Sequence, residues 1–584
     1  MMTNQEITLD ELIQKVRDVE SRTAEQPEVT QMITTVGQQV IEAANSGKVK
    51  ILTDYDADGI TSAYIMETLL KSVNPDCEVS VQCNDRRGAY GLSPDVQGDG
   101  VSRYIVCDMG SNQLPLARER LGENVIMFDH HLIVDEQNRL AFQNIEQNNA
   151  CLCNPHALHE DDSENAQYCA AGLVYRAYQE VQNLCKEQNI PFHTSEKQEN
   201  TVLAVACIGT VTDMVSLLDE HSLNREIVKN GMKAIDNAEP KNFDGVIGYV
   251  LTKCGLDEKD CTAKQLAFNV GAFLNSASRM SEIMQENGAQ RMYQALMGGE
   301  KAETYFELDD LLTLNKERKD YVKELQGEDF RAFADCERQT ENHIAVYLTE
   351  QNTPSAFCGL VAGKLTESTD KAILCLTYHE DGDFWSGSGR NAHGNTSLKQ
   401  FLDWIAETPE MEGVTFRYGG HEDAVGISRL DNCSALQEAV QKYQHLMERD
   451  DSQRTVLKLS QSEISSPETL DKLKALEPVG MGLKIPPVVI EGKELYKAQG
   501  FVQNRQDWKR IKVKGLQIPV SDWSYAPEKY PQKSGEIKLL AEMSISNYGN
   551  SSHVELSAVT DRAFLKERQQ ELEQKKPERK PIDR

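Results

Sequence analysis

The sequence lacks any long apolar run and any recognisable secretion signal. Hydrophobic residues make up 39% of its 584 positions, and no stretch approaches the roughly 20 consecutive apolar residues that a membrane-spanning helix needs. Residues 1–6 offer no basic start followed by an apolar core, which a secretory signal would show. We therefore expect a soluble, cytoplasmic protein with no membrane partner.

The sequence also lacks CxxC pairs and an excess of basic residues. Its 14 cysteines are scattered, which is typical of a reduced intracellular protein. Cys151 and Cys153 stand two residues apart, but no second Cys or His cluster follows at zinc spacing, so an ordinary strand is the better interpretation. The formal net charge of −30 excludes a generally basic protein that coats nucleic acid, although it leaves room for a local basic channel.

Hydrophobic periodicity divides the chain into an expected series of segments. Three apolar runs between residues 46 and 290 each end in acids or histidines, which predicts a parallel α/β sheet with its ligand site beyond the carboxyl ends of the strands. Residues from about 290 to 335 are rich in Leu, Glu and Lys and free of proline, which predicts a long helix. Glycine-rich turns are expected at 387–394 and 419–426. The expected organisation is an N-terminal helical segment (1–45), a catalytic α/β domain (46–290), a long connecting helix (291–335), a smaller α/β domain (336–450), a small β-barrel (451–560) and a charged tail (561–584).

An acidic loop follows the first strand-like run. Asp54, Asp56 and Asp58 stand on alternate residues, and three such carboxylates repel one another unless cations lie between them. Hard oxygen ligands suit Mg²⁺ or Mn²⁺, and pairs of these ions stabilise the attacking and leaving oxygens of a phosphoryl displacement. The twelve-residue EF-hand pattern is absent. A plain acidic loop or another calcium site remains the alternative.

Further acids and two histidines follow later strands. Asp108 ends the second apolar run and Asp129-His130-His131 ends the third. Imidazole ligands favour a transition metal such as Mn²⁺ over Ca²⁺, and a histidine beside the metal can supply a proton. The segment 209–215 adds Asp213, which we expect in a tight glycine-containing turn.

These four motifs, DYDADG, CDMGS, FDHH and GTVTDMV, resemble those of the DHH phosphoesterase superfamily. The resemblance implies a site for two divalent ions, Mn²⁺ or Mg²⁺. The implied metal ligands are Asp54, Asp56, Asp58, Asp108, His130 and Asp213. The implied catalytic residues are Asp108, a bridge between the metals, with His130 and His131. By the same resemblance, His131 contacts the scissile phosphate or the leaving group and not a metal.

Signatures over roughly residues 45–560 are similar to the RecJ-type single-strand exonucleases of that superfamily. They include 154–156, 168–172, 218–225 and 274–280. The resemblance implies that the smaller α/β domain is a DHHA1-like substrate-binding domain and that the barrel is an OB-fold, entered at 476–482. The implied substrate-binding residues are Arg86, Tyr90, Asn275, Arg279, Ser388, Arg390, Gly420 and His421. Residues 84–91 are shorter than the family's pattern, so Arg86 and Arg87 remain alternatives. Base stacking and barrel packing remain equal readings for Trp508 and Trp523.

The expected function is that of a metal-dependent 5′-to-3′ exonuclease. It would hydrolyse the phosphodiester bonds of single-stranded nucleic acid, DNA rather than RNA, and release 5′-mononucleotides during DNA repair or recombination. A single-strand-binding protein or a helicase would be its partner. A DHH phosphodiesterase for short oligonucleotides or cyclic dinucleotides, and a noncatalytic repair scaffold, remain alternatives. Thr212, Ser216 and residues 391–394 depart from the family's pattern, which leaves substrate preference, polarity and processivity open.

Overall fold

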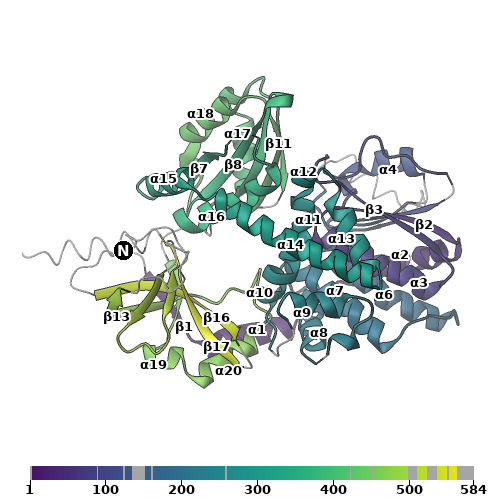
Figure 1. Cartoon of the computed structure of the whole chain (residues 1–584), viewed down its shortest axis with the longest axis horizontal. Coiled ribbons are helices and arrows are strands. Elements are labelled where there is room, and N and C mark those ends of the chain that lie inside the picture. Colours follow the sequence, from purple (N-terminus) through teal and green to yellow (C-terminus); the bar gives the residue numbers. More distant parts are fainter. Residues whose placement is uncertain are drawn as a thin grey trace, which may run out of the picture.

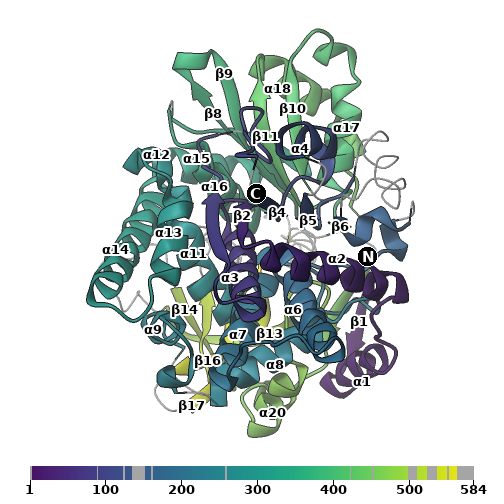
Figure 2. The same ribbon diagram turned by 90° about the vertical axis from the view of Figure 1, so that its right-hand side faces the viewer.

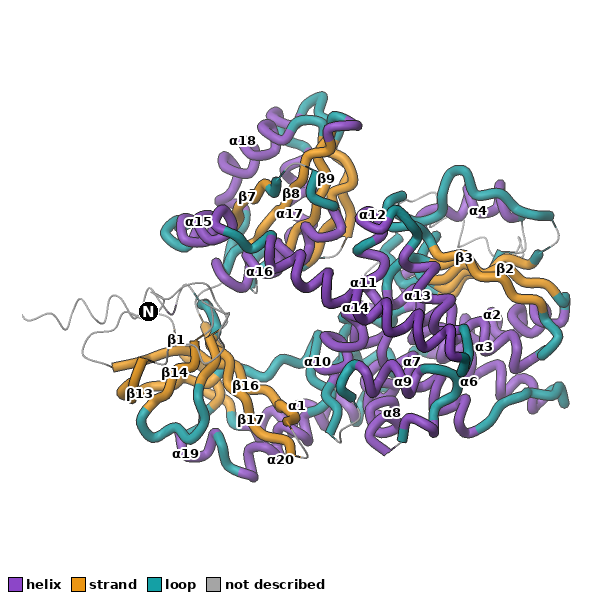
Figure 3. Tube along the Cα trace, viewed as in Figure 1, coloured by secondary structure: helices purple, strands orange, loops and turns teal. Residues whose placement is uncertain are grey.

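The computed structural model contains three separate β-sheets, each with its own covering helices (Figures 1 and 3). The structure describes residues 3–88, 90–100, 102–122, 125–133, 151–159, 162–237, 239–256, 260–350, 352–392, 394–420, 422–449, 453–497, 509–522, 536–548, 551–561 and 564. Among these residues, no helix has the length and apolar content that would let it cross a membrane. The mixed α/β architecture with a parallel sheet agrees with the sequence-based expectation.

The first sheet has five strands, all parallel, in the order β3-β2-β4-β5-β6. The strands are β2 (Lys48–Thr53), β3 (Glu78–Cys83), β4 (Arg103–Cys107), β5 (Ile126–Phe128) and β6 (Cys151–Cys153). Alternate side chains of the central strands enter two different cores, one against α2 (Pro27–Asn45), α3 (Ala57–Val73) and α6 (Ala170–Glu187), the other against α4 (Leu114–Leu121). Figure 2 shows these helices on opposite faces. Burial on both faces explains why the strands are continuously apolar.

Residues 209–213, which the sequence predicts to be a turn, lie in a helix. The segment 209–213 ends α7 (Glu196–Asp213) and does not form the expected tight turn. Gly209 packs so closely against Thr61 and Ala171 that an added Cβ would overlap both. The glycine therefore serves helix packing. The helices that follow are α8 (Asn224–Asn237), α9 (Ile247–Lys253), α10 (Ala263–Gln265), a π-helical turn (Leu266–Gly271), α11 (Ala272–Arg279) and α12 (Ser281–Met284).

The single long helix expected over 291–335 is wrong. Three helices occupy this region, α13 (Gly288–Met297), α14 (Ala302–Glu324) and α15 (Glu328–Glu337). Gly298 and Gly299 separate the first two, and the φ of +71° at Gly299 is one that helical residues do not adopt. Gly327, with an extended backbone, precedes the third. The connection between the two α/β parts is therefore a series of three helices separated at glycines.

The second sheet is mixed, in the order β10-β11-β9-β8-β7, with β7 and β8 parallel and the other pairs antiparallel. Its strands are β7 (Ile344–Leu348), β8 (Ala372–His379), β9 (Phe384–Arg390), β10 (Phe416–Gly420) and β11 (Ala424–Leu430). One face packs on α15 and α16 (Cys358–Thr369), and the other packs on α17 (Leu398–Ala406) and α18 (Cys433–Tyr443). Residues 387–390, expected in a turn, belong to β9. Gly387 lies against the Cys375 backbone with no room for a Cβ.

The third sheet closes on itself and includes the first strand of the chain. Its members are β1 (Thr3–Ile7), β12 (Gln453–Leu457), β13 (Val488–Lys497), β14 (Lys509–Val513), β15 (Val520–Asp522), β16 (Glu536–Tyr548) and β17 (Ser551–Ala558). Pairings from β13 through β14, β15, β17 and β16 return to β13, as in a small barrel. β1 pairs in parallel with β12, so residues 3–7 form a strand within the segment expected to be helical. Helix α1 (Leu9–Glu20) follows it, and α19 (Gln461–Ile464) and α20 (Pro467–Leu476) precede β13.

The segment that leads from α20 into the barrel lies against the part of the molecule that contains the first sheet. The Leu217 amide donates to the Met481 carbonyl at 2.9 Å. Arg225, only 6% exposed, donates to the carbonyls of Pro478 (2.6 Å) and Leu476 (2.9 Å). The signature 218–225 thus places a buried guanidinium that holds the entrance to the barrel.

Candidate active site

The carboxyl ends of three adjacent parallel strands meet at one edge of the first sheet. Asp54 follows β2, Asp108 follows β4, and Asp129 with the two histidines follows β5. The last residue of α7, Asp213, enters from the helical side. The sequence therefore folds to bring its four motifs together, as expected for a ligand site beyond strand ends.

The acidic loop is shaped by two helix N-termini. Asp56 caps α3, its Oδ1 accepting from the amides of Asp58 (2.9 Å) and Gly59 (3.2 Å). Asp58 accepts from the first turn of α6, Ala170 N to Oδ2 at 2.7 Å and Ala171 N to Oδ1 at 2.9 Å. These amides point at a carboxylate from the positive end of a helix. Each aspartate thus has one fixed orientation before any ion binds.

Three groups of side chains bring potential metal-ligating atoms within 4.8 Å of one another. The groups are Asp54-Asp56-Asp108, Asp58-His130-Asp213 and Asp108-His130-His131. His130 lies at the centre: its Nε2 is 3.2 Å from Asp108 Oδ1 and 3.6 Å from Asp213 Oδ2. All six residues expected as metal ligands are therefore in one cluster, and Asp108 belongs to two of the three groups.

Burial and mutual repulsion raise the pKa of most of these carboxyls. Burial, reinforced by Asp56, raises the pKa of Asp54 to about 7, and burial with Asp213 does the same for Asp58. The pKa of Asp108 is raised well above its usual value by burial and by Asp58. Such a set of crowded anions requires positive charge between its members to be fully ionised.

Two observations fit divalent cations to this cluster. The buried oxygens Asp54 Oδ1 and Asp108 Oδ1 accept no hydrogen bond from the described residues, and buried polar atoms normally have a partner. Burial and the neighbouring His131 lower the pKa of His130 to about 4, so its imidazole is neutral at neutral pH, the form that binds metal ions. Hard oxygen ligands with one imidazole suit Mg²⁺ and, better, Mn²⁺.

Asp129 orients His131 and does not point at the acidic cluster. Its Oδ1 accepts from His131 Nδ1 at 2.7 Å and its Oδ2 accepts from the Ser111 amide at 2.8 Å. Burial alone would lower the pKa of His131, but the Asp129 carboxylate raises it to about 9. The other ring nitrogen, Nε2, lies 2.6 Å from the Tyr90 hydroxyl. His131 is thus a protonated imidazolium at neutral pH, held beside the cluster.

A group of arginines lies at the side of the acidic loop that faces the second sheet. The Arg86 guanidinium stacks over the Tyr55 ring at 4.7 Å, and Arg279 donates to the Ala356 carbonyl at 2.8 Å. Burial and the positive charges of Arg86 and Arg390 lower the pKa of Arg279. Three guanidinium groups that repel one another form a site that an anion would stabilise.

The remaining expected substrate residues are spread more widely. Asn275 accepts from the Ala57 amide at 3.1 Å, beside the acidic loop. Ser388 and Arg390 both lie on β9, next to Gly359. Gly420 ends β10, two strands away from β9, with a φ of +134°. His421 lies outside the described residues, as do Trp508 and Trp523.

Sequence reasoning missed the backbone groups that orient the site. The signature 168–172 was recognised without a role, yet its amides hold Asp58. Likewise, Asn154 donates from Nδ2 to the His131 carbonyl at 2.9 Å and to Ser111 Oγ at 2.8 Å. Both roles depend on contacts between distant segments. The only available signal was the resemblance of the motifs themselves.

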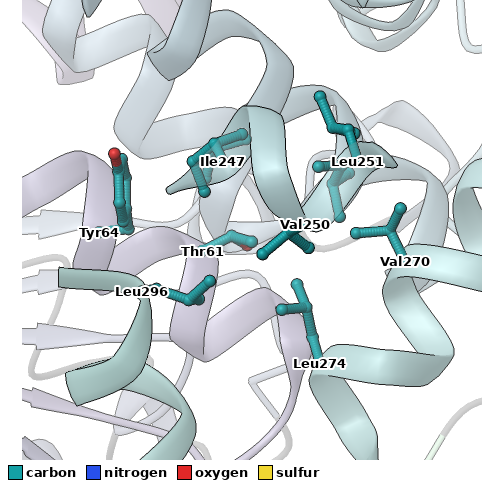
Figure 4. Close-up of a pocket in the computed structure, with 10 residues that line it drawn as sticks. Thr61, Tyr64, Ile247, Val250, Leu251, Val270, Leu274 and Leu296 are labelled. Carbon is teal, nitrogen blue, oxygen red and sulfur yellow. The ribbon is translucent and has the colours of Figure 1, made fainter. Parts of the chain in front are cut away.

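A small apolar cavity lies behind the acidic loop, between α3, α9, α11 and α13 (Figure 4). Thr61 and Tyr64 of α3 line it together with Val250, Leu274 and Leu296. No charged side chain is among its lining residues. It is a packing void within the core and offers no group that could act on a substrate.

A match to a known family spans the first three motifs. Residues 48–210 match the DHH family, N-terminal domain. The chain is 23% identical over 492 residues to the single-stranded-DNA-specific exonuclease RecJ of Dickeya dadantii, covering 82% of this chain and 80% of that protein. It is 23% identical over 523 residues to RecJ of Bacillus subtilis, covering 87% of this chain but only 60% of that protein.

Solved structures show the same fold. RecJ of Thermus thermophilus in complex with Mn²⁺ aligns with a TM-score of 0.66 at 20% identity, covering 92% of this chain and 72% of that one. Its complex with Mg²⁺ aligns with a TM-score of 0.59 at 18% identity, over 91% of this chain and 70% of that one. The chain is therefore similar to RecJ in sequence and in fold over most of its length, and residues 48–210 match the DHH family domain.

Proposed function

We propose that this chain is a metal-dependent phosphodiester hydrolase that removes nucleotides from the 5′ end of single-stranded DNA. The observation that carries the proposal is the cluster of six side chains that could hold metal ions, four of them buried, next to three guanidinium groups. Relatives over most of the chain are single-stranded-DNA-specific exonucleases, which supports DNA as the substrate. We place its work in DNA repair or recombination in the cytoplasm, with a single-strand-binding protein or a helicase supplying single strands.

Two divalent ions, Mn²⁺ or Mg²⁺, would be held by Asp54, Asp56, Asp58, Asp108, His130 and Asp213. When bound, such ions supply an activated water and neutralise the charge that develops on the phosphate. The protein's own contribution is orientation. The amides at the start of α6 fix Asp58, and the neutral imidazole of His130 lies between Asp108 and Asp213.

His131 acts as a proton donor or as a contact to the scissile phosphate. Asp129 keeps its ring protonated at neutral pH and fixes its tilt through Nδ1. The Nε2 proton then points away from Asp129, toward Tyr90 in this structure. A substrate oxygen that replaces the Tyr90 hydroxyl would receive this hydrogen bond.

The arginines select the end of the strand. Arg279, with Arg86 and Arg390, binds the terminal phosphate, and Asn275 holds the acidic loop beside it. The second α/β part, 336–450, is a DHHA1-like substrate-binding domain that adds Ser388, Gly420 and His421. Because a terminal phosphate carries more charge than an internal one, this arrangement favours chain ends and releases 5′-mononucleotides.

The barrel holds the strand that follows. We propose that residues 451–560 form an OB-fold-like domain, that residues 46–290 are the catalytic domain, and that 291–335 connects the two α/β domains. Lys512 and Lys514 are exposed on β14 and the turn after it, where cations can follow a phosphate backbone. Such local basic groups are compatible with the strongly acidic chain as a whole.

One assay tests the proposal against its alternatives. The purified full chain with Mn²⁺ is given 5′-labelled long single strands, duplexes, dinucleotides and cyclic dinucleotides. We expect release of 5′-mononucleotides from single strands, and loss of this activity in Asp108→Ala with the fold retained by circular dichroism. Hydrolysis of dinucleotides alone would point to a small-substrate phosphodiesterase. Binding of single strands with no hydrolysis of any substrate would point to a scaffold.

A further inference from the structure

One continuous helical run, residues 263–279, extends from the barrel past the candidate active site. It comprises α10, the π-helical turn and α11. At its start, Gln265 Oε1 accepts from Asn547 Nδ2 of β16 at 3.3 Å. Its last turns carry Asn275 beside the acidic loop and Arg279 among the arginines. Figure 1 shows α10 on the side of the catalytic part that faces β16.

Two side chains of this run, Lys264 and Phe268, are exposed. Ala272, Asn275 and Arg279 further along are half-buried, as are Gln265, Ala267 and Asn269. Leu266, Val270 and Phe273 are buried and hold the run in the core. The run therefore presents polar and aromatic side chains between the barrel and the proposed phosphate site.

An aromatic ring is exposed in the middle of this helical run. Phe268 is 68% exposed and lies in the π-helical turn, a distortion found mostly at functional sites. Three residues further, Gly271 packs against Thr212 with no room for a Cβ, which brings the end of α7 alongside. Met214, two residues beyond Thr212, is 61% exposed. Met214 directly follows Asp213, and Phe268 belongs to the helical turn that packs against the end of α7.

The distribution of exposed apolar side chains supports a functional reading. A single exposed apolar residue needs no explanation. Seven large ones are exposed in the described part of the chain. Of these, Tyr90 contacts His131, Met214 follows Asp213, and Phe268 lies in the helical run that carries Asn275 and Arg279. The charged side chains near the two ends of this run, Lys264 and Arg279, are both positive. Cations that alternate with an aromatic ring are the pattern by which proteins hold single-stranded nucleic acid.

We propose that Phe268 is a stacking platform for one base of the strand downstream of the nucleotide being removed. Lys264 would contact a backbone phosphate beyond that base. The inference rests on the proposed exonuclease function and extends it with a residue that discriminates between substrates. A strand anchored at Arg279 reaches Phe268 after roughly 17 Å, the length of eleven helical residues. A base within a duplex is already stacked and paired, so only a single strand can use the ring.

The test combines variants of Phe268 with strands that lack one base. Phe268→Ala, Phe268→Leu and Phe268→Trp are compared with Phe306→Ala, which truncates an equally exposed phenylalanine (73%) on α14. Each full-length protein with Mn²⁺ is assayed on a single strand and on strands with one abasic nucleotide at each of the first eight positions. KM and kcat are measured separately, and circular dichroism checks the fold.

We expect Phe268→Ala and Phe268→Leu to raise the KM for the intact strand about 5- to 150-fold, the range for one lost base stack. Phe268→Trp should restore the KM, and Phe306→Ala should leave it unchanged. In the parent protein, one abasic position should raise KM as much as Phe268→Ala does. At that position, Phe268→Ala should add no further increase.

Two results would overturn the stacking inference without affecting the proposed function. One is a KM for Phe268→Ala that matches Phe306→Ala, and the other is full additivity between Phe268→Ala and every abasic position. In both cases the strand is still hydrolysed, so the proposed function stands. If the parent protein hydrolyses no strand at all, the proposed function fails and the stacking inference fails with it.

Discussion

Replacing Arg225 with Met should loosen the attachment of the barrel to the catalytic part. The guanidinium donates to two carbonyls at the barrel entrance, on Leu476 and Pro478, and its Nε donates to Glu20 at 2.6 Å. Methionine retains much of the apolar stem but donates nothing. The two carbonyls would then be buried without a partner, on a segment whose neighbour, Met481, is the acceptor for the Leu217 amide.

The structure sets the size of the effect. A buried acceptor left without its partner costs about 1–3 kcal/mol, and two carbonyls lose their donor here. Glu20 adds little, because its side chain is 31% exposed and keeps Lys229 as a partner. We therefore expect the free-energy cost of local opening at the barrel entrance to fall by about 3 kcal/mol. Exchange of the Leu217 amide through that opening should accelerate on the order of 100-fold, since every 1.4 kcal/mol is a factor of ten.

Hydrogen–deuterium exchange of peptides covering 214–218 and 476–483 measures this opening directly. Lys229→Met is the matched control, because Lys229 shares Glu20 at 2.9 Å yet is 38% exposed and does not reach the barrel entrance. Exposed pairs of this kind contribute at most about 1 kcal/mol. If the two variants exchange these peptides at equal rates, Arg225 does not hold the barrel and the reasoning is refuted.

Three further predictions concern charge. Metal-free protein should lose thermal stability as pH rises from about 4 to 7. In the folded protein Asp54 and Asp213 have a pKa of about 7, so they keep protons that the unfolded chain releases near pH 3.8. A stability profile that is flat over this range, or that Mn²⁺ does not alter, would contradict the prediction. Glu477→Gln should raise the free energy of unfolding at pH 8, but not at pH 4, on the order of 1–2 kcal/mol. Burial raises the Glu477 pKa to about 7, and the amide still accepts from the same backbone N–H groups. The measurement is the melting temperature; equal values for the two proteins at pH 8 would show that burying this ionised carboxyl costs the fold nothing. Asp129→Asn should lower kcat about 10- to 100-fold with the fold retained, because His131 loses the carboxylate that orients and charges it; an unchanged kcat would remove His131 from the chemistry.

The position of most site residues could be predicted from the sequence because strand ends are predictable. Asp54, Asp108 and Asp129 each follow a continuously apolar run, and the carboxyl ends of adjacent parallel strands must share an edge. The alternate spacing of Asp54 and Asp56 in the sequence did not show that Asp56 caps a helix. That role appears only when α3 begins directly at Ala57.

Glycine was the main source of wrong expectations. At 209 and 387 it was interpreted as a turn signal, whereas it permits close packing inside α7 and β9. At 298–299 the same residue type does break a helix, where a single long helix was expected. A local pattern cannot distinguish these cases, since the difference lies in whether another backbone approaches within a few ångströms. The pairing of β1 with β12 was equally inaccessible, because no periodicity relates segments so far apart.

That pairing has a consequence for the order in which the protein can be completed during its synthesis. The first sheet is finished once β6 has been made, but the partner that β1 has among the described residues, β12, is made only with residues 453–457. At ribosomal rates of about 5–20 residues per second, synthesis of the roughly 450 residues between β1 and β12 takes about 20–90 s. Until then Thr3–Ile7 lacks this partner, and an open strand edge can pair with another chain. Nascent molecules on one messenger would thus be exposed to mutual pairing during this interval, and a chaperone that covers residues 3–7 would have its greatest effect there.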